Sequence, residues 1–236
     1  MVSICMATYN GERYIREQLN SILSQISDED EIIISDDSST DKTIDIIYEY
    51  IDKANIKLLK NQKFHSPIFN FENAIKHANG DYIFLCDQDD VWLPNKLNKM
   101  KKELEKFDLV VSDCRIVDEK LNIISESFFS NLKSGKGFWK NLAINTYLGC
   151  CMAFRKDVCN YILPFPKGIA MHDIWIGLSV ELNGSIKFMN EPLILYRRHG
   201  DNASSSSEKS NYSIFYRLKY RIKMLSYLIT RKYFNK

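Results

Sequence analysis

The stretch Tyr82-Ile83-Phe84-Leu85-Cys86-Asp87-Gln88-Asp89-Asp90 joins a short apolar run directly to a cluster of carboxylates. Residues 82–86 have the length and composition of a buried strand. Adjacent carboxylates repel one another and resist transfer out of water, so residues 87–90 are costly to place anywhere dry. The stretch therefore predicts a core strand whose carboxyl end carries an acidic site.

Short apolar runs alternate with amphipathic runs on both sides of this stretch. The predicted strands are 2–7, 31–35, 55–59, 81–86 and 109–113. The predicted helices are 12–25, 40–53, 69–78 and 96–106. The alternation is typical of βαβ units, and it predicts an α/β fold with a Rossmann-like, mostly parallel central sheet and helices on both faces.

The second half of the chain is less regular. We predict a loop or hairpin over 118–136, a helix over 170–182, and strands over 149–154, 186–189 and 193–197. Residues 203–210 include four consecutive serines and predict a flexible linker. Residues 212–234 predict an aromatic, basic, amphipathic helix.

Three predicted strands end in polar residues. The first ends in Thr8-Tyr9-Asn10-Gly11, the second runs into residues 36–41, and the fourth into residues 87–90. Ligands of doubly wound sheets bind beyond the carboxyl ends of strands, so these residues line one crevice if the three strands are neighbours. No glycine-rich dinucleotide fingerprint or P-loop is present, so a bound diphosphate would need a metal or basic side chains to neutralise it.

The acidic cluster allows two interpretations. Carboxylate oxygens suit hard divalent cations such as Mg²⁺ or Mn²⁺, which bridge carboxylates to phosphates. Alternatively, the cluster is an acidic turn before the helix that begins after Pro94, where negative charge is also favourable.

Composition predicts one sizeable domain with a small appendage. The chain has 236 residues, 45% of them hydrophobic and 26% charged. Its six cysteines form no CxxC pair and lie mostly in apolar runs, which indicates reduced thiols and a cytoplasmic location. We see no secretion leader and no apolar run as long as a membrane span.

Charge is distributed unevenly along the chain. No aspartate or glutamate follows Glu208, whereas eight of the 32 basic residues do. The tail is thus expected to meet an anionic partner, either phospholipid headgroups or nucleic acid, or else to form a solvated helical face. A helix of this kind can lie on a membrane, or it can dock on another subunit or on the rest of the chain.

The order of the motifs resembles family 2 glycosyltransferases of the GT-A fold. The resemblance covers about residues 1–203. Within the family, the residues that make up its motifs are most similar to those of bacterial rhamnosyltransferases and related surface-polysaccharide transferases. The motifs that carry the resemblance are Thr8-Tyr9-Asn10, Asp36-Asp37-Ser38-Ser39-Thr40-Asp41, Asp87-Gln88-Asp89-Asp90-Val91-Trp92-Leu93-Pro94, Gly149-Cys150-Cys151-Met152-Ala153-Phe154-Arg155-Lys156, His172-Asp173-Ile174-Trp175 and Tyr196-Arg197-Arg198-His199-Gly200.

The resemblance implies a division of labour along the chain. Residues 1–113 would form the nucleotide-binding half, 114–203 the half with the acceptor site and the catalytic base, and 204–236 the linker and tail. In the nucleotide-binding half, Tyr9 would lie against the base, and Asp37 would accept from the N3 hydrogen of uracil or thymine.

The resemblance also assigns ligands and a base. The nucleotide-sugar site would comprise Thr8, Tyr9, Asn10, Asp37, Asp87, Trp92 and Arg197. Asp89, with Asp87 and His199, would hold Mn²⁺ or Mg²⁺. Asp173 would be the general base, although an aspartate there also fits the charge at a helix start. Many relatives have glutamate where this chain has His172, which leaves the role of that neighbour open.

The implied activity is inverting transfer of a sugar from a UDP- or dTDP-sugar, dTDP-rhamnose among them. The acceptor would be a hydroxyl of a growing, lipid-linked bacterial surface glycan. The enzyme would be cytoplasmic and peripheral on the inner face of the plasma membrane, with no nucleic-acid partner. The alternatives are a nucleotidyltransferase and a non-catalytic module that binds a nucleotide or polyanion.

Overall fold

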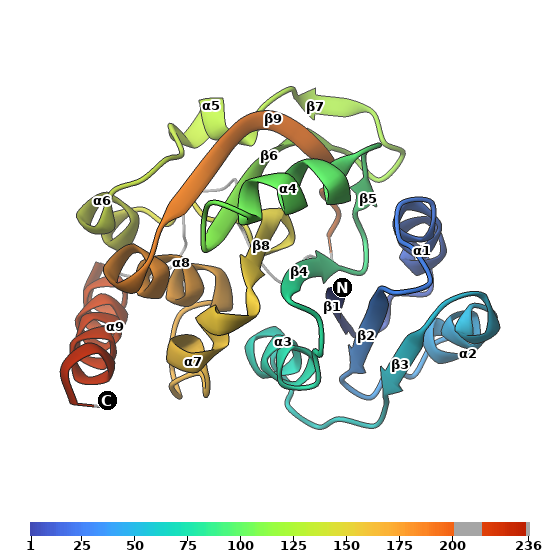
Figure 1. The fold of residues 1–236 in the computed structure, drawn as a ribbon, viewed down its shortest axis with the longest axis horizontal. Helices are drawn as coiled ribbons and strands as arrows, with labels where there is room; N and C mark the ends of the chain where they lie inside the picture. Colours follow the sequence, from blue (N-terminus) through green and yellow to red (C-terminus); the bar gives the residue numbers. More distant parts are fainter. Residues whose placement is uncertain (201–213, 235–236) are drawn as a thin grey trace.

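A computed structural model of the chain describes residues 1–200 and 214–234. Within these ranges nine strands form one sheet (Figure 1). The strands are β1 (Val2–Thr8), β2 (Glu31–Asp36), β3 (Ile56–Leu59), β4 (Tyr82–Asp87), β5 (Val91–Trp92), β6 (Leu109–Val117), β7 (Ile123–Ser125), β8 (Met152–Arg155) and β9 (Ile186–Arg197). Their order is β3-β2-β1-β4-β8-β6-β9-β5, and β7 pairs with β6.

Helices connect the strands and cover the sheet. They are α1 (Ile15–Leu23), α2 (Thr43–Tyr48), α3 (Pro67–Lys76), α4 (Lys96–Leu104), α5 (Phe128–Leu132), α6 (Phe138–Ala143), α7 (Cys159–Ile162), α8 (His172–Asn183) and α9 (Ile214–Phe234). Three short 3-10 turns are η1 (Ile51–Lys53), η2 (Gly149–Cys151) and η3 (Lys156–Val158). The structure confirms the predicted α/β class.

The first four predicted strands form the parallel part of the sheet. β1 lies between β2 and β4 and runs parallel to both, with Thr8 paired to Asp36 and Ala7 to Asp87. These strands are buried on both faces, which explains their nearly continuous apolar sequences. The three polar strand ends therefore meet at one edge of the sheet, as the sequence predicts.

The second half of the sheet mixes strand directions. β8 runs antiparallel between β4 and β6, whereas the long strand β9 runs parallel to β6. The predicted strands 186–189 and 193–197 are one strand, β9, whose register shifts between Met189 and Pro192. A proline has no N–H to donate to a neighbouring strand, so a bulge accommodates Pro192.

Helix limits differ from the sequence predictions mainly at the ends. The predicted helix 40–53 is α2 followed by η1. The carboxylate of Asp41 accepts from Thr43 N at 3.0 Å, where α2 begins. The predicted strand 149–154 begins as the turn η2 before β8. The region 118–136, predicted as loop or hairpin, contains β7 and the short helix α5.

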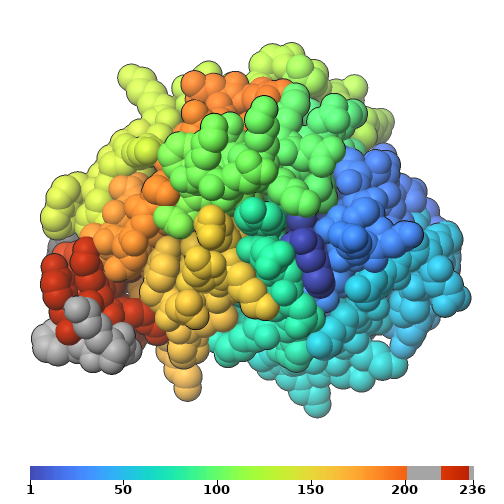
Figure 2. Space-filling view, in the orientation of Figure 1, coloured from blue at the N-terminus to red at the C-terminus, as the bar shows by residue number. Residues whose placement is uncertain are grey.

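The carboxyl-terminal helix α9 packs against α8 rather than standing apart (Figure 1). Met224 and Leu228 of α9 are buried, and Lys232 Nζ donates to Leu182 O at 2.7 Å at the end of α8. In the space-filling view, α9 forms the edge of the molecule farthest from the amino-terminal strands (Figure 2). No described helix combines the length and apolar content that a membrane span requires. The predicted linker 203–210 lies outside the described residues.

Gly177 in α8 lies against the ring of Tyr147, and a Cβ there would come within 2.3 Å of Tyr147 Cε2. We expect Gly177→Ala to destabilise the protein by about 1–3 kcal/mol, because overpacking a rigid ring outweighs the gain in helix propensity. Urea unfolding measures this change. Gly200→Ala, whose Cβ would meet nothing within 4 Å, is the matched control. Equal midpoints for the two variants would contradict the close packing of α8 on Tyr147.

Candidate active site

A cavity of about 420 Å³ opens at the carboxyl edge of β1, β2 and β4. One side is formed by the loops after these strands, and the other by the segment around η2 and the start of α8. Six of the residues predicted for the site line it, namely Thr8, Tyr9, Asp37, Asp87, Asp89 and Asp173. The fold thus brings together residues that are up to 165 positions apart in sequence.

The Tyr9 loop is held by the middle residue of the acidic motif. Gln88 Oε1 accepts from Tyr9 N, and Gln88 Nε2 donates to Tyr9 O, both at 2.9 Å. A Cβ on Gly11 would lie 2.3 Å from Gln88 Oε1, so this close approach needs a glycine. The side chain of Tyr9, 57% exposed, is left at the mouth of the cavity, where its ring is available for stacking.

Asp37 organises a second loop of the cavity. Its carboxylate accepts from Phe64 N at 2.7 Å and from Ser66 N at 3.0 Å. These bonds position His65, Ser66 and Pro67 in the cavity wall. A carboxylate has about four acceptor sites, so Asp37 retains capacity to accept from a ligand.

Thr8 and Asn10 join the first two strand ends. Thr8 Oγ1 donates to Asp36 Oδ2 at 2.9 Å. Asn10, at a positive φ of 48°, accepts from Thr40 N at 2.8 Å through its side-chain oxygen. Thr8 lines the cavity, whereas Asn10 shapes the loop behind it.

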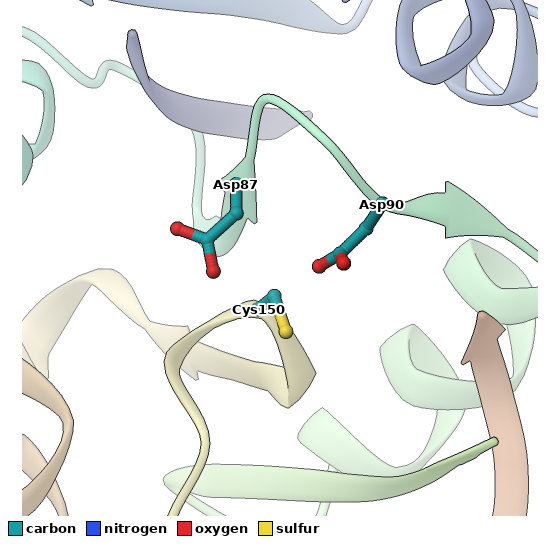
Figure 3. A group of neighbouring side chains, drawn as sticks. All are labelled: Asp87, Asp90 and Cys150. Carbon is teal, nitrogen blue, oxygen red and sulfur yellow. The ribbon is translucent and has the colours of Figure 1, made fainter. Parts of the chain in front are cut away.

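The acidic motif presents a concentrated negative charge. Asp87, Asp90 and Cys150 lie near one another, at the end of β4, in the turn before β5 and in η2 (Figure 3), and their ligand atoms all lie within 4.8 Å of one another. Asp90 Oδ2 is buried and accepts no hydrogen bond from any described residue. Burial, reinforced by the charge of Asp89, raises the pKa of both Asp87 and Asp90. A nearby cation would relieve this cost.

Asp89 is next to the histidine predicted to share its cation. His199 Nε2 lies 2.8 Å from Asp89 Oδ2, and the His199 ring packs on Tyr14 with centroids 4.8 Å apart. Carboxylates with a neutral imidazole form a donor set that Mn²⁺ and Mg²⁺ accept. The buried, unpartnered Asp90 Oδ2 belongs to the neighbouring group formed by Asp87, Asp90 and Cys150, whose carboxylates fit a divalent cation.

Arg197 braces the acidic loop from behind. Its Nε donates to Asp89 O at 2.8 Å, and its backbone N donates to Asp90 Oδ1 at 3.0 Å. Arg197 also forms an ion pair with Glu17 of α1. Its side chain is buried and does not line the cavity, so the structure gives it a positioning contact to Asp89.

The structure separates the tryptophans from the cavity. Trp92 is buried and packs on Phe84, with ring centroids 5.8 Å apart. Trp175 is also buried, and its Nε1 donates to Ile162 O at 2.8 Å. Neither residue lines the cavity, so the aromatic contacts available there come from Tyr9, Phe71 and Tyr196.

Asp173 lies in the first turn of α8, on the wall that faces the acidic motif. Its Oδ1 accepts from Asn145 Nδ2 at 3.1 Å and from the N–H of Ile174. No described residue donates to its second oxygen, Oδ2. Burial raises the pKa of Asp173 to about 7, although both hydrogen bonds oppose that rise. A carboxyl group with this pKa can exchange a proton near neutral pH.

His172 lines the same wall and is neutral. It is buried between Phe71, with ring centroids 4.2 Å apart, and Gly149, where a Cβ would lie 2.4 Å from Nε2. Burial lowers the pKa of His172 to about 3. Neither ring nitrogen has a hydrogen-bond partner among the described residues. His172 is therefore a polar group of the cavity wall with its hydrogen-bonding capacity unused.

Three positioning residues escaped the sequence analysis. Gln88 ties the acidic motif to Tyr9, Asn145 orients Asp173, and Gln18 Nε2 donates to Asp87 O at 2.9 Å. Each has an amide side chain, and the local sequence around it does not predict which residue that amide contacts. A polar residue on the buried face of helix 12–25 was the one available hint, since Gln18 is fully buried in α1.

Comparison with known proteins defines the class. The model of the family described as Glycosyl transferase family 2 matches residues 3–163. The dTDP-rhamnosyl transferase RfbG of Shigella flexneri is 31% identical, over 88% of this chain and 76% of that protein. The UDP-Glc:alpha-D-GlcNAc-diphosphoundecaprenol beta-1,3-glucosyltransferase WfgD of Escherichia coli is 28% identical, over 89% of this chain and 81% of that protein.

Solved structures share the fold. Residues 1–349 of S. aureus TarS, in complex with UDP, superpose with a TM-score of 0.71 at 20% identity. The match covers 97% of this chain and 65% of the TarS chain, so this chain spans less than two thirds of that structure. The chain belongs to glycosyl transferase family 2, and its α/β architecture is of the GT-A type.

The burial of His172 gives a direct spectroscopic test of the cavity wall. We expect the ring of His172, whose NMR resonances are assigned through His172→Gln, to stay neutral down to about pH 3. A His172 resonance that titrates between roughly pH 6 and 7 would show that water reaches this wall.

Proposed function

We propose that this protein transfers a sugar, with inversion, from a UDP- or dTDP-sugar to a hydroxyl group of a glycan acceptor. The observation that carries the proposal is the position of Asp173. It is a buried carboxylate, oriented by Asn145, in the same cavity as the acidic motif that follows β4. A nucleotide-binding module has no need for a base on the wall opposite its phosphate site.

The nucleotide would bind over the ends of β1 and β2. Tyr9 offers an exposed ring, and Asp37 offers acceptor capacity to the N3 hydrogen that uracil and thymine carry and cytosine lacks. The diphosphate would then lie beside Asp87 and Asp89. Thr8 and Asn10 support this proposal indirectly, because they hold the strand ends in place.

Asp89, Asp87 and His199 would hold Mn²⁺ or Mg²⁺. The cation, when bound, acts as a Lewis acid that stabilises the negative charge of the departing diphosphate. The protein contributes a rigid loop, since Arg197 fixes the backbone of Asp89 and the carboxylate of Asp90.

The transfer step follows from the position of the base. The acceptor hydroxyl would donate its proton to Asp173 Oδ2 as its oxygen forms a bond to the anomeric carbon of the donor. The bond from that carbon to the phosphate oxygen breaks, and the nucleoside diphosphate leaves with the bonding electron pair. Attack and departure on opposite faces of the sugar invert the anomeric configuration.

The acceptor is proposed to be a lipid-linked bacterial surface glycan, and the protein to be peripheral on the inner face of the membrane. RfbG and WfgD support this proposal by their names, because one uses dTDP-rhamnose and the other acts on a diphosphoundecaprenol-linked sugar. dTDP-rhamnose is accordingly a first donor to test. Residues 1–113 would bind the donor and 114–203 the acceptor.

Metal-dependent release of a nucleoside diphosphate tests the donor site. We expect one UDP- or dTDP-sugar from a panel that includes dTDP-rhamnose, UDP-glucose and GDP-mannose to release its nucleoside diphosphate only with Mn²⁺ or Mg²⁺. Asp89→Ala should reduce release by roughly a hundredfold or more, because it removes the main cation ligand. The exposed Asp52→Ala is the matched control.

The products separate the alternatives. Release of pyrophosphate in place of the nucleoside diphosphate would identify a nucleotidyltransferase. Absence of binding by any donor in calorimetry would contradict the nucleotide-sugar proposal.

The pH dependence of turnover tests the base. Asp173 acts only when it is deprotonated, so the rate should fall about tenfold per pH unit as the pH drops below about 7, the raised pKa of Asp173. Asp173→Asn should abolish turnover while donor binding measured by calorimetry persists. The exposed Asp157→Asn, in η3, should leave both unchanged. Turnover by Asp173→Asn at the wild-type rate would rule out the assigned base.

A further inference from the structure

Two segments without acidic residues meet at one end of the molecule. No aspartate or glutamate lies between Glu126 and Asp157, and none follows Glu208. The first segment contains α6 and the second contains α9. Arg221 of α9 donates a hydrogen bond to Ala143 O at the end of α6, and the two helices lie side by side in Figure 1. The fold thus concentrates basic residues that are far apart in sequence.

The α6 side of this end carries exposed apolar groups. Trp139 is 70% exposed, and its ring and that of Phe138 form an edge-to-face pair with centroids 5.2 Å apart. Ile144, directly after α6, is 61% exposed. Lys133, Lys136 and Lys140, on the same segment, are also exposed. A large exposed aromatic side chain with lysines nearby in sequence is typical of the interfacial region of a membrane.

The α9 side continues the pattern. Ile222, Ile229 and Tyr233 are exposed, and at about 100° per residue they fall within a sector of roughly 40°. Met224 and Leu228, on the opposite side, are buried against the protein. The exposed stripe is bordered by Lys219 and Lys223, which are also exposed. One face of α9 therefore serves the core, and the other is an apolar stripe with a basic border.

We infer that α6 and α9 together form a docking face for an anionic lipid bilayer, with Trp139, Ile144, Ile222, Ile229 and Tyr233 as its apolar contacts. The sequence hypothesis assigned membrane contact to the tail alone, whereas this face needs both segments. Charge complementarity selects the lipid, because lysines and Arg221 border the apolar groups, and an anionic headgroup layer attracts them. The carboxylate of Glu181 lies under α6 and accepts hydrogen bonds from Gly137 N, Asn141 Nδ2 and the hydroxyl of Tyr147.

This face is connected to the active site by one residue. Asn145 follows Ile144 directly and donates to Asp173 Oδ1 at 3.1 Å. The docking face and the proposed base are therefore connected through Ile144, its neighbour Asn145 and one hydrogen bond. If the acceptor is lipid-linked, as the proposed function has it, docking would present its sugar to the side of the cavity that holds Asp173.

Tryptophan fluorescence and vesicle flotation test the face. Trp92 and Trp175 are buried, so a change in emission on docking reports Trp139. With vesicles that contain roughly one-third phosphatidylglycerol, we expect flotation of the protein and a blue shift, both weakened by 1 M salt. Pure phosphatidylcholine vesicles should bind far less. Trp139→Ala/Ile222→Ala should reduce binding roughly tenfold or more.

The matched control is Ile123→Ala/Ile124→Ala, which removes two exposed apolar side chains from β7, away from α6 and α9 (Figure 1). This variant should float like the wild type. Flotation of Trp139→Ala/Ile222→Ala at the wild-type level, or no blue shift on binding, would overturn the inference. So would a blue shift that grows with protein concentration without vesicles, which would identify a second copy of the chain as the occupant.

Vesicle binding and nucleoside diphosphate release are separate measurements. Release without vesicle binding would leave the proposed transfer intact and refute this face. Vesicle binding without binding of any donor in calorimetry would support the face and refute the proposed transfer.

Discussion

Electrostatic repulsion within the loop that follows β4 is the constraint on which the site depends. Asp87, Asp89 and Asp90 are held close together in a largely buried turn, where like charges are unfavourable. Contacts from other elements keep this turn in place, through Gln18 of α1 and Arg197 at the end of β9. These contacts bind the backbone carbonyls of Asp87 and Asp89 as well as the carboxylate of Asp90, so part of the support for the loop does not depend on its charge.

The parallel half of the fold could be predicted from the sequence with good accuracy. Strands buried on both faces, such as β1 and β4, give continuous apolar runs with clear ends. The second half was harder to predict because its information is not local. The bulge that makes β9 one strand, and the turn before β8, depend on pairing with β6, which no short window of sequence contains.

The same distinction applies to the site. Residues at strand ends, such as Asp37 and Asp87, could be predicted because parallel strands bring their ends together. The family resemblance drew attention to Asp173, which lines the same cavity. Asn145 and Gln88 could not be predicted, since their roles rest on hydrogen bonds between loops. Trp92 and Trp139 show that closeness to a motif in sequence does not predict exposure. Trp92, beside the acidic motif, is buried in the core, and Trp139, with no motif nearby, is on the surface.

The helix α8 connects the wall of the cavity to the contact with α9. Its first turn carries Asp173, and about 14 Å farther along the helix axis Lys232 of α9 donates to the carbonyl of Leu182. A cation at that terminus complements the helix dipole, so α9 stabilises the helix whose first turn carries Asp173. The carboxyl-terminal helix does not line the cavity, and it contributes to the cavity wall through its support of α8.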